Sequence, residues 1–205
     1  SKSNLKDYNG AISDYTKAIE LNPDTAVAYS NRGNSKSNLK DYNGAISDYT
    51  KAIELNPNYA NAYYNRGNSK KKLKDYNGAI SDYTKAIELD PNFAGAYNNR
   101  GNSKKKLKDY YGAISDYTKA IELDPNFADA YYNRGVSKKN LKDNYGAISD
   151  YTKAIELNPN DANAYVNRGI SKEILGDLNG ACADWKKAAE LGDTDAAGWV
   201  ANQCN

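Results

Sequence analysis

An asparagine recurs at a fixed spacing along the chain and offers the clearest chemistry in the sequence. Its side chain carries a hydrogen-bond donor and an acceptor together, which matches the alternating C=O and N–H groups of an extended peptide backbone. We therefore predict that each copy contributes one backbone contact to a bound peptide. Alternatively, asparagine recurs only because an exposed position of the helix tolerates a polar residue. The five residues form what we call the Asn column: Asn31, Asn65, Asn99, Asn133 and Asn167.

The positions beside the Asn column differ between copies, although most of the sequence barely changes. Residues 61, 65, 68 and 72 are separated by four, three and four positions, so they share one side of a helix, with residues 64 and 71 at its edges. We expect these varied positions to give the site its preference among peptides. The candidate residues are Asn68, Asn102, Tyr64, Tyr132, Lys71, Lys72, Lys105 and Lys106.

The same face changes character along the chain. Its middle is basic through the four lysines just named and Lys139, whereas Val136, Val166, Ile170 and Ile174 make its later part apolar. An acidic, extended peptide followed by an apolar anchor would complement this surface. Alternatively, the lysines are only solvated and the apolar residues pack against the end of the chain.

A recurring arginine stands on the opposite stripe of the same helix, where a charge needs a partner. An aspartate recurs in the following helix wherever the arginine recurs. We predict salt bridges within a hairpin or between neighbouring hairpins, while Lys70, on the same stripe, should lift its ammonium into water. The predicted pairs are Arg32–Asp48, Arg66–Asp82, Arg100–Asp116, Arg134–Asp150 and Arg168–Asp184.

Residues suited to catalysis or metal binding are scarce. There is no His, no C-x-x-C pair and no phosphate-binding loop, so we expect no enzyme activity, no cofactor and no metal. Cys182 and Cys204 are compatible with a disulfide in an oxidising compartment or with buried thiols. Free thiols are our expectation.

Composition narrows the partners further. A net charge of +2 is too small for a nucleic-acid-binding surface, and no apolar run is long enough to span a membrane. No targeting segment is visible, and the location stays unknown, with the cytoplasm favoured over other compartments. Only 40% of residues are hydrophobic, and there are 19 Tyr against 2 Phe. This favours a thin core in which tyrosine rings are buried and their hydroxyls stay near polar groups.

These residues belong to a unit of 34 residues that repeats without insertions. The copy from Ala60 to Phe93 predicts a first helix over 60–73 with Asn58 as its N-cap, and a second over 77–89 that Pro91 ends. Gly67 and Ala79 should form the close contact where the two helices cross. Neither helix can bury its apolar stripe alone, so the hairpins must stack.

The pattern resembles the tetratricopeptide repeat. Small and helix-ending positions match, whereas Arg66, Lys70 and Tyr83 replace large apolar or aromatic residues of the family pattern. The resemblance implies an all-α fold, a right-handed α-solenoid of stacked antiparallel helix pairs whose first helices line a concave groove. The matching residues are Tyr63, Arg66, Gly67, Lys70, Ala79, Tyr83, Ala86 and Pro91.

The repeats divide the chain into a partial hairpin at 1–25, full hairpins at 26–59, 60–93, 94–127 and 128–161, a divergent hairpin at 162–194 and a capping helix at 195–205. We expect a non-catalytic scaffold that holds a protein or peptide, binding neither nucleic acid nor membrane. The alternative is a structural module that stacks end to end through its uncapped N-terminal face. The chain would accordingly be a monomer or associate weakly with itself.

Overall fold

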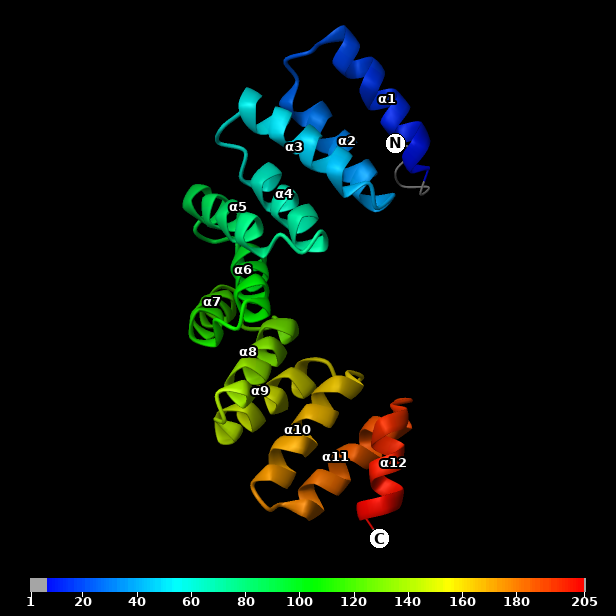
Figure 1. The fold of residues 1–205 in the computed structure, drawn as a ribbon, viewed down its shortest axis with the longest axis vertical. Helices are drawn as coiled ribbons and strands as arrows, with labels where there is room; N and C mark the ends of the chain where they lie inside the picture. The colour runs from blue at the N-terminus through cyan, green and yellow to red at the C-terminus, as the bar shows by residue number, and fades with distance from the viewer. Residues whose placement is uncertain (1–6, 205) are drawn as a thin grey trace. The chain divides into compact units, whose positions relative to one another are not determined.

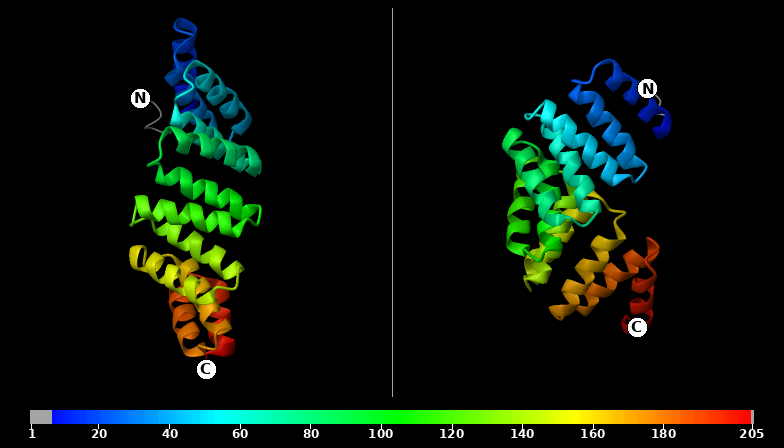
Figure 2. Two further views of the ribbon diagram at one scale, coloured as in Figure 1. Left: turned by 90° about the vertical axis from the view of Figure 1, so that its left-hand side faces the viewer. Right: turned by 45° about the horizontal axis from the view of Figure 1, so that its top comes forward.

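The computed structural model describes residues 7–204, and the chain separates into two compact units. Every regular element in these residues is an α-helix, so the fold is all-α, and consecutive helices within each unit pack as stacked pairs of an α-solenoid (Figures 1 and 2). The first unit, Ser1–Leu107, contains α1 Tyr8–Leu21, α2 Ala26–Asn38, α3 Tyr42–Leu55, α4 Ala60–Lys72, α5 Tyr76–Leu89 and α6 Ala94–Lys106. The second, Lys108–Asn205, contains α7 Tyr110–Leu123, α8 Ala128–Asn140, α9 Asn144–Leu157, α10 Ala162–Ile174, α11 Leu178–Glu190 and α12 Thr194–Gln203.

The two helices of a hairpin begin in different ways. Asp75 caps α5, its Oδ1 accepting the backbone N–H of Gly78 at 2.9 Å. The first helix α4 has Tyr59 at its N-cap and no side-chain cap. The prediction of Asn58 as the cap is therefore wrong, because Asn58 stands one residue too early. Its own N–H is instead held by Asn56 Oδ1 at 3.1 Å.

Each core combines small residues with buried tyrosines. Tyr83 and Ala86 are fully buried, and a Cβ on Gly67 would lie 2.8 Å from Tyr83 Cε1. The glycine thus makes room for the tyrosine ring. The expected close approach of Gly67 to Ala79 stays a prediction, and in a later repeat the equivalent Ala181 O lies 3.2 Å from a Cβ placed on Gly169. A side chain at position 67 would overpack the contact with the Tyr83 ring.

The first helix of the described chain lacks the cover that its copies have. α1, α3 and α5 share the sequence YNGAISDYTKAIEL. Ala52 of α3 is fully buried, whereas Ala18 at the same place in α1 is exposed. Residues 1–6 of the partial hairpin expected at 1–25 lie outside the described residues.

The C-terminal helix closes the other end. Trp199 of α12 packs against Trp185 of α11 with ring centroids 5.3 Å apart. Cys182 and Cys204 form a disulfide, so the expectation of free thiols is wrong. The two ends of the α11–α12 hairpin bring these residues together, which sequence spacing alone does not reveal. Because disulfides persist in oxidising compartments, the bond also weighs against a cytoplasmic location.

Candidate functional site

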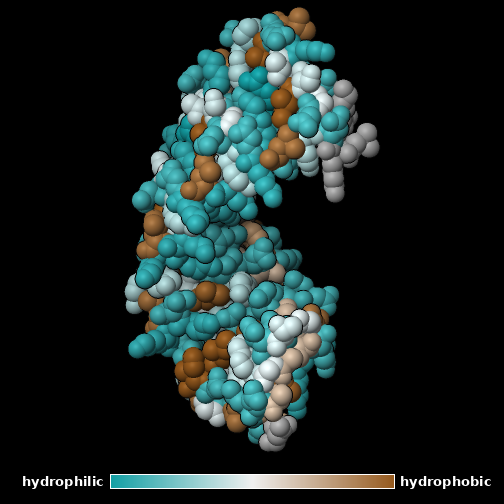
Figure 3. Space-filling model, turned by 45° about the vertical axis from the view of Figure 1, so that its right-hand side comes forward, coloured by the Kyte–Doolittle hydropathy of each residue, from teal (hydrophilic) through white to brown (hydrophobic). Residues whose placement is uncertain are grey.

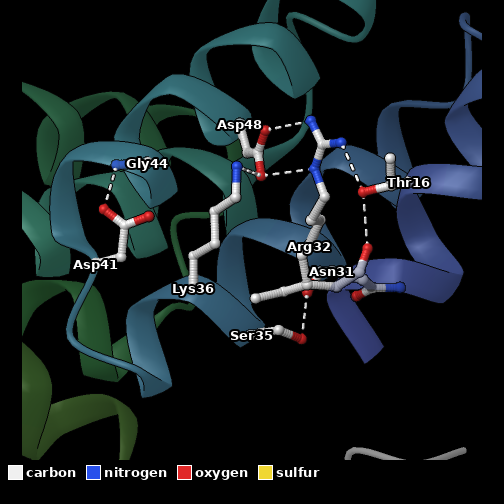
Figure 4. A network of polar contacts seen from close by, with 9 residues as sticks. Thr16, Asn31, Arg32, Ser35, Lys36, Asp41, Gly44 and Asp48 are labelled. Atoms are coloured by element: carbon white, nitrogen blue, oxygen red, sulfur yellow. Dashed lines mark hydrogen bonds and ion pairs between the residues drawn. The ribbon is translucent and has the colours of Figure 1, made fainter. Parts of the chain in front are cut away.

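The recurring arginine lies in a network between helices rather than on an open face. Arg32 Nε donates to Asp48 Oδ2 at 3.0 Å and its Nη2 to Oδ1 at 2.7 Å (Figure 4). Its Nη1 donates to Thr16 Oγ1 of the preceding helix α1 at 3.2 Å. The planar guanidinium therefore holds two hairpins together through a bidentate carboxylate contact.

A lysine completes this network. Lys36 Nζ lies 2.8 Å from Asp48 Oδ2, and Lys70 Nζ lies 2.8 Å from Asp82 Oδ2. The expectation that Lys70 reaches into water is wrong, because the buried carboxylate can accept both cations. In these repeats one aspartate therefore pairs with an arginine and a lysine, and it offsets the cost of placing two positive charges between packed helices.

The same arrangement recurs in both units. The guanidinium is bonded to both carboxylate oxygens in Arg66–Asp82, Arg134–Asp150 and Arg168–Asp184. Arg100 and Asp116 belong to different units; Arg100 donates to Thr84 in its own unit, and Asp116 is buried. These residues build the scaffold, and the opposite face of the first helices carries the residues predicted to bind a peptide.

On that opposite face, two residues of the Asn column in the first unit, Asn65 and Asn99, bond to the preceding hairpin. Asn65 Nδ2 donates to Asn34 Oδ1 at 3.1 Å. Asn99 Nδ2 donates to Asn68 Oδ1 at 3.1 Å and to Tyr64 Oη at 2.8 Å. The column is thus preorganised by neighbouring side chains rather than extended freely into solvent.

The acceptor oxygens of the column are used unevenly. Asn99 Oδ1 receives Lys71 Nζ at 2.8 Å, whereas no donor among residues 7–204 bonds Asn65 Oδ1. Asn31 and Asn133 are half-buried on α2 and α8. Among residues 7–204, no donor bonds Asn31 Oδ1 either. The first unit therefore offers open acceptors at Asn31 and Asn65, while the acceptor of Asn99 is occupied by a flexible lysine side chain.

In the second unit, Asn167 is held on both sides. Its Nδ2 donates to Tyr132 Oη at 3.2 Å and to Asn163 O at 2.9 Å. Its Oδ1 accepts a hydrogen bond from Lys139 Nζ at 2.5 Å. The Tyr132 ring lies 5.9 Å from that of Tyr151, and burial raises the pKa of Tyr132. Tyr132 is therefore a neutral phenol that links the column to the core.

Sequence reasoning missed the link between this face and the buried tyrosines. Tyr49 Oη donates to Asn34 Oδ1, and Tyr83 Oη donates to Asn68 Oδ1, each at 2.8 Å. Asn68 therefore serves a core tyrosine as well as the face on which it was predicted. The available signal was that Asn34 and Asn68 stand in register with tyrosines of the following helix.

The predicted lysines lie at the last turns of α4 and α6. Lys71 and Lys105 are half-buried, whereas Lys72 and Lys106 are exposed. Burial, and then the charge of the adjacent lysine, lowers the pKa of Lys71 to about 8, and Lys105 shows the same pKa for the same two reasons. The structure brings these four lysines and Asn102 around one hollow.

The surface is otherwise polar, as the low hydropathy of the sequence indicates. Hydrophilic side chains predominate on the face shown in Figure 3, with hydrophobic ones in separate small groups. Within residues 7–204, no cluster of His, Cys, Asp or Glu is arranged to hold a metal. None of the helices described is long and apolar enough to cross a bilayer.

Stacked helix hairpins with a repeated Arg–Asp–Lys network define a repeat scaffold, and sequence comparison identifies its family. A tetratricopeptide repeat model matches residues 26–59, 60–93, 94–127 and 128–161. Two further repeat models match residues 4–39 and 150–183. The chain belongs to the tetratricopeptide repeat family. No curated protein matches it in sequence.

Solved structures share the arrangement. The MamA crystal structure is 30% identical with a TM-score of 0.75, covering 80% of this chain and 96% of MamA. YrrB, described as a tetratricopeptide repeat protein with an unusual peptide-binding site, is 27% identical with a TM-score of 0.77, covering 92% and 97%. PilF of Pseudomonas aeruginosa, at 17% identity, a TM-score of 0.84 and coverage of 98% and 92%, shows the fold alone. These similarities support a protein-interaction module.

Proposed function

We propose that the chain is a non-catalytic scaffold that binds an extended peptide segment of a partner protein along its first helices. The observation that carries the proposal is that, within each unit, the Asn column and its neighbours present amide and phenol groups on the same face of the first helices. These groups are half-buried, so their positions are fixed before a peptide arrives and little ordering entropy is lost on binding. The peptide-binding site of YrrB supports the same class of function.

The contacts within the column suggest how a peptide is accepted. Asn65 Oδ1 can receive a peptide N–H directly. At Asn99, a peptide N–H replaces Lys71 as the donor to Oδ1, and Lys71 moves to an acidic group of the peptide. Since each protein hydrogen bond is exchanged for another, the peptide binds without leaving a buried amide unsatisfied.

The specificity of the proposed site comes from the residues around the column. Tyr64 and Tyr132 offer phenol edges, and the lysines of α4 and α6 favour acidic peptides. In the second unit, Val136, Val166 and Ile170 are half-buried. Val166 and Ile170 pack beside the cluster formed by Trp185, so the proposed apolar anchor is a side chain that extends this cluster.

The test is a screen of an array of extended acidic peptides, followed by affinity measurements on the best binder. Asn65→Ala together with Asn99→Ala should weaken binding by ~0.5–1.5 kcal/mol for each lost bond. The matched control is Asn43→Ala with Asn77→Ala, two exposed asparagines on α3 and α5. Binding that survives the column variant unchanged would contradict the proposal.

Light scattering over a concentration series separates this proposal from end-to-end assembly. A peptide-binding scaffold should keep a constant mass, whereas an assembling module should grow with concentration. Growth without peptide binding would replace the proposed function with the structural one.

A further inference from the structure

One hollow in the first unit concentrates positive charge. It lies among the last turns of α4 and α6 and the first residue of α5, and we call it the basic hollow. Four of its six lining residues are lysines, and none is acidic. The lining residues are Lys71, Lys72, Tyr76, Asn102, Lys105 and Lys106.

The hairpin itself does not require this charge. A second hollow in the same unit, between α2, α3 and α4, is lined only by neutral residues, including Ser37 and Asn38. Ser37 and Asn38 are the counterparts of Lys71 and Lys72 one repeat earlier, and the later counterparts of this pair are Lys139–Asn140 and Glu173–Ile174. Paired lysines occur in two successive repeats, where they meet.

Protonation of two lysines in the basic hollow is disfavoured by their surroundings. Burial and the neighbouring ammonium lower the pKa of Lys71 and of Lys105 to about 8. Lys70, one residue earlier, shows the contrast because it is paired with Asp82 at 2.8 Å. The contact recorded for Lys71 Nζ is the neutral Asn99 Oδ1. An anion in the hollow would offset both the burial and the mutual repulsion.

We propose that the basic hollow binds the phosphoryl group of a phosphorylated serine or threonine in the bound peptide. This inference rests on the proposed peptide-binding function and names one chemical group that the site recognises. The neutral hollow beside it would accept an uncharged stretch of the same peptide.

Charge and hydrogen-bonding capacity favour a phosphoryl group over a carboxylate. A phosphoserine carries about −1.5 to −2 charges at pH 7 and three strong acceptor oxygens. A single carboxylate carries one charge and two oxygens, so it offsets less of the positive charge of the four lysines. Lysine binds phosphate as a point charge and needs no fixed planar geometry, and the Asn102 amide and Tyr76 hydroxyl add neutral donors.

The probes are three pentapeptides, acetyl-Ala-Ala-X-Ala-Ala-amide, in which X is phosphoserine, glutamate or serine. Their binding to the full chain is followed by NMR through the side-chain amide signals of Asn99 and Asn102, which report on the hollow. We expect the phosphoserine peptide to bind at least tenfold more tightly than the serine peptide, with the glutamate peptide between them. Equal affinities of the three peptides would overturn the inference.

Two matched variants separate the hollow from the general charge of the protein. Lys71→Ser with Lys72→Asn copies the preceding repeat and should reduce phosphoserine binding at least tenfold. Lys51→Ser with Lys85→Ser removes the same charge from exposed lysines that pair with Glu54 and Glu88, and should change it less than twofold because salt screens distant charges. An equal loss in both variants would show attraction without a site.

A gain-of-function variant guards against misfolding as an explanation. Ser37→Lys with Asn38→Lys should make the neutral hollow basic, and the phosphoserine peptide should then also shift the amide signals of Asn65 and Asn68. Affinity at the original hollow should fall roughly tenfold between pH 7 and pH 9, as Lys71 and Lys105 lose their protons. An affinity that does not change over this range would contradict the role of these two lysines.

Inorganic phosphate that binds as tightly as the phosphoserine peptide would overturn the assignment to a peptide side chain. If the array peptides bind through the Asn column but phosphorylation has no effect, only this inference fails. If phosphoserine binds the hollow and the column variant leaves peptide affinity unchanged, the proposed recognition of the peptide backbone fails instead.

Discussion

Tyr83 in the first unit and Tyr151 in the second occupy the same place in their hairpins and are both fully buried. Tyr83 Oη donates to Asn68 at 2.8 Å, whereas Tyr151 Oη is buried without a partner among the described residues. The repeat position held by Asn68 is Val136 in the second unit. Trp185, whose Nε1 is also buried without a partner among residues 7–204, stands in the same relation to Ile170.

This difference shows that the face of the first helix that we propose to bind peptide, called the binding face below, also takes part in the core. In the first unit, an amide on the binding face also satisfies a core hydroxyl. In the second, this face is apolar, and the buried hydroxyl of the core loses its hydrogen bond. Leaving such a buried group unpaired costs about 1–3 kcal/mol. Changes that adjust the binding face are therefore not neutral for stability.

The largest expected effect on stability comes from the Arg–Asp–Lys network, which both units contain. Asp82→Ala and Asp184→Ala each leave an arginine and a lysine without their buried carboxylate. Each should lower the free energy of unfolding by ~3 kcal/mol, at the low end for a broken buried pair because the cations keep some contact with solvent. Urea denaturation followed by circular dichroism measures both.

The control for this pair is Glu88→Ala, which removes an exposed contact with Lys85 and should cost ~0–0.5 kcal/mol. A clear difference between Asp82→Ala and Asp184→Ala would mean that the two units differ in their scaffold as well as in their binding face.

A smaller loss of stability is expected when Asn68 of the first unit is replaced by valine, the residue that the second unit has at the equivalent position 136. Asn68→Val removes the acceptor of Tyr83 Oη and one acceptor of Asn99 Nδ2. The free energy of unfolding should fall by ~1–3 kcal/mol, because the buried hydroxyl loses its partner. If thermal and urea unfolding show no loss, Tyr83 must reach water or another acceptor, and the comparison with Tyr151 loses its meaning.

The smallest effect comes from the reverse exchange. Val136→Asn should give Tyr151 Oη an acceptor and raise the free energy of unfolding by ~0.5–1.5 kcal/mol. A double-mutant cycle with Tyr151→Phe isolates the bond: the phenylalanine should be nearly neutral in the native chain and destabilising in the Val136→Asn background. Equal effects of Tyr151→Phe in both backgrounds would exclude the new hydrogen bond.

Features set within one repeat could be predicted from the sequence. The helix pairs and the all-α fold follow from the period of the repeat, and the arginine and aspartate recur in step on helices that must pack. The ion pair of Lys70 could not be predicted, because helical spacing does not show that Asp82 accepts two cations. The prediction at Asn58 fails because the helix starts one residue later than a cap there would allow.

Features that need two repeats could not be derived in this way. The bonds from Asn65 to Asn34 and from Asn99 to Asn68 depend on how neighbouring hairpins stack, which the period alone does not give. The basic hollow likewise forms only where the lysines of α4 and α6 meet. The disulfide joins residues 22 positions apart whose proximity depends on the packing of α12.

The last described helix, α12, lacks the residues that join one repeat to the next. Asn202 and Gln203 stand where Arg168 and Gly169 stand one repeat earlier. A Cβ at Gly169 would already lie 2.5 Å from Trp185 Nε1, so a following second helix with an aromatic ring there could not dock on Gln203. The aspartate of such a helix would also lack its arginine partner, because Asn202 stands at that position of α12. α1 keeps the aspartate and tyrosine of a second helix, yet α12 cannot receive them. Direct docking of α1 of a second copy on α12 would therefore lack the glycine and arginine contacts that join α10 to α11.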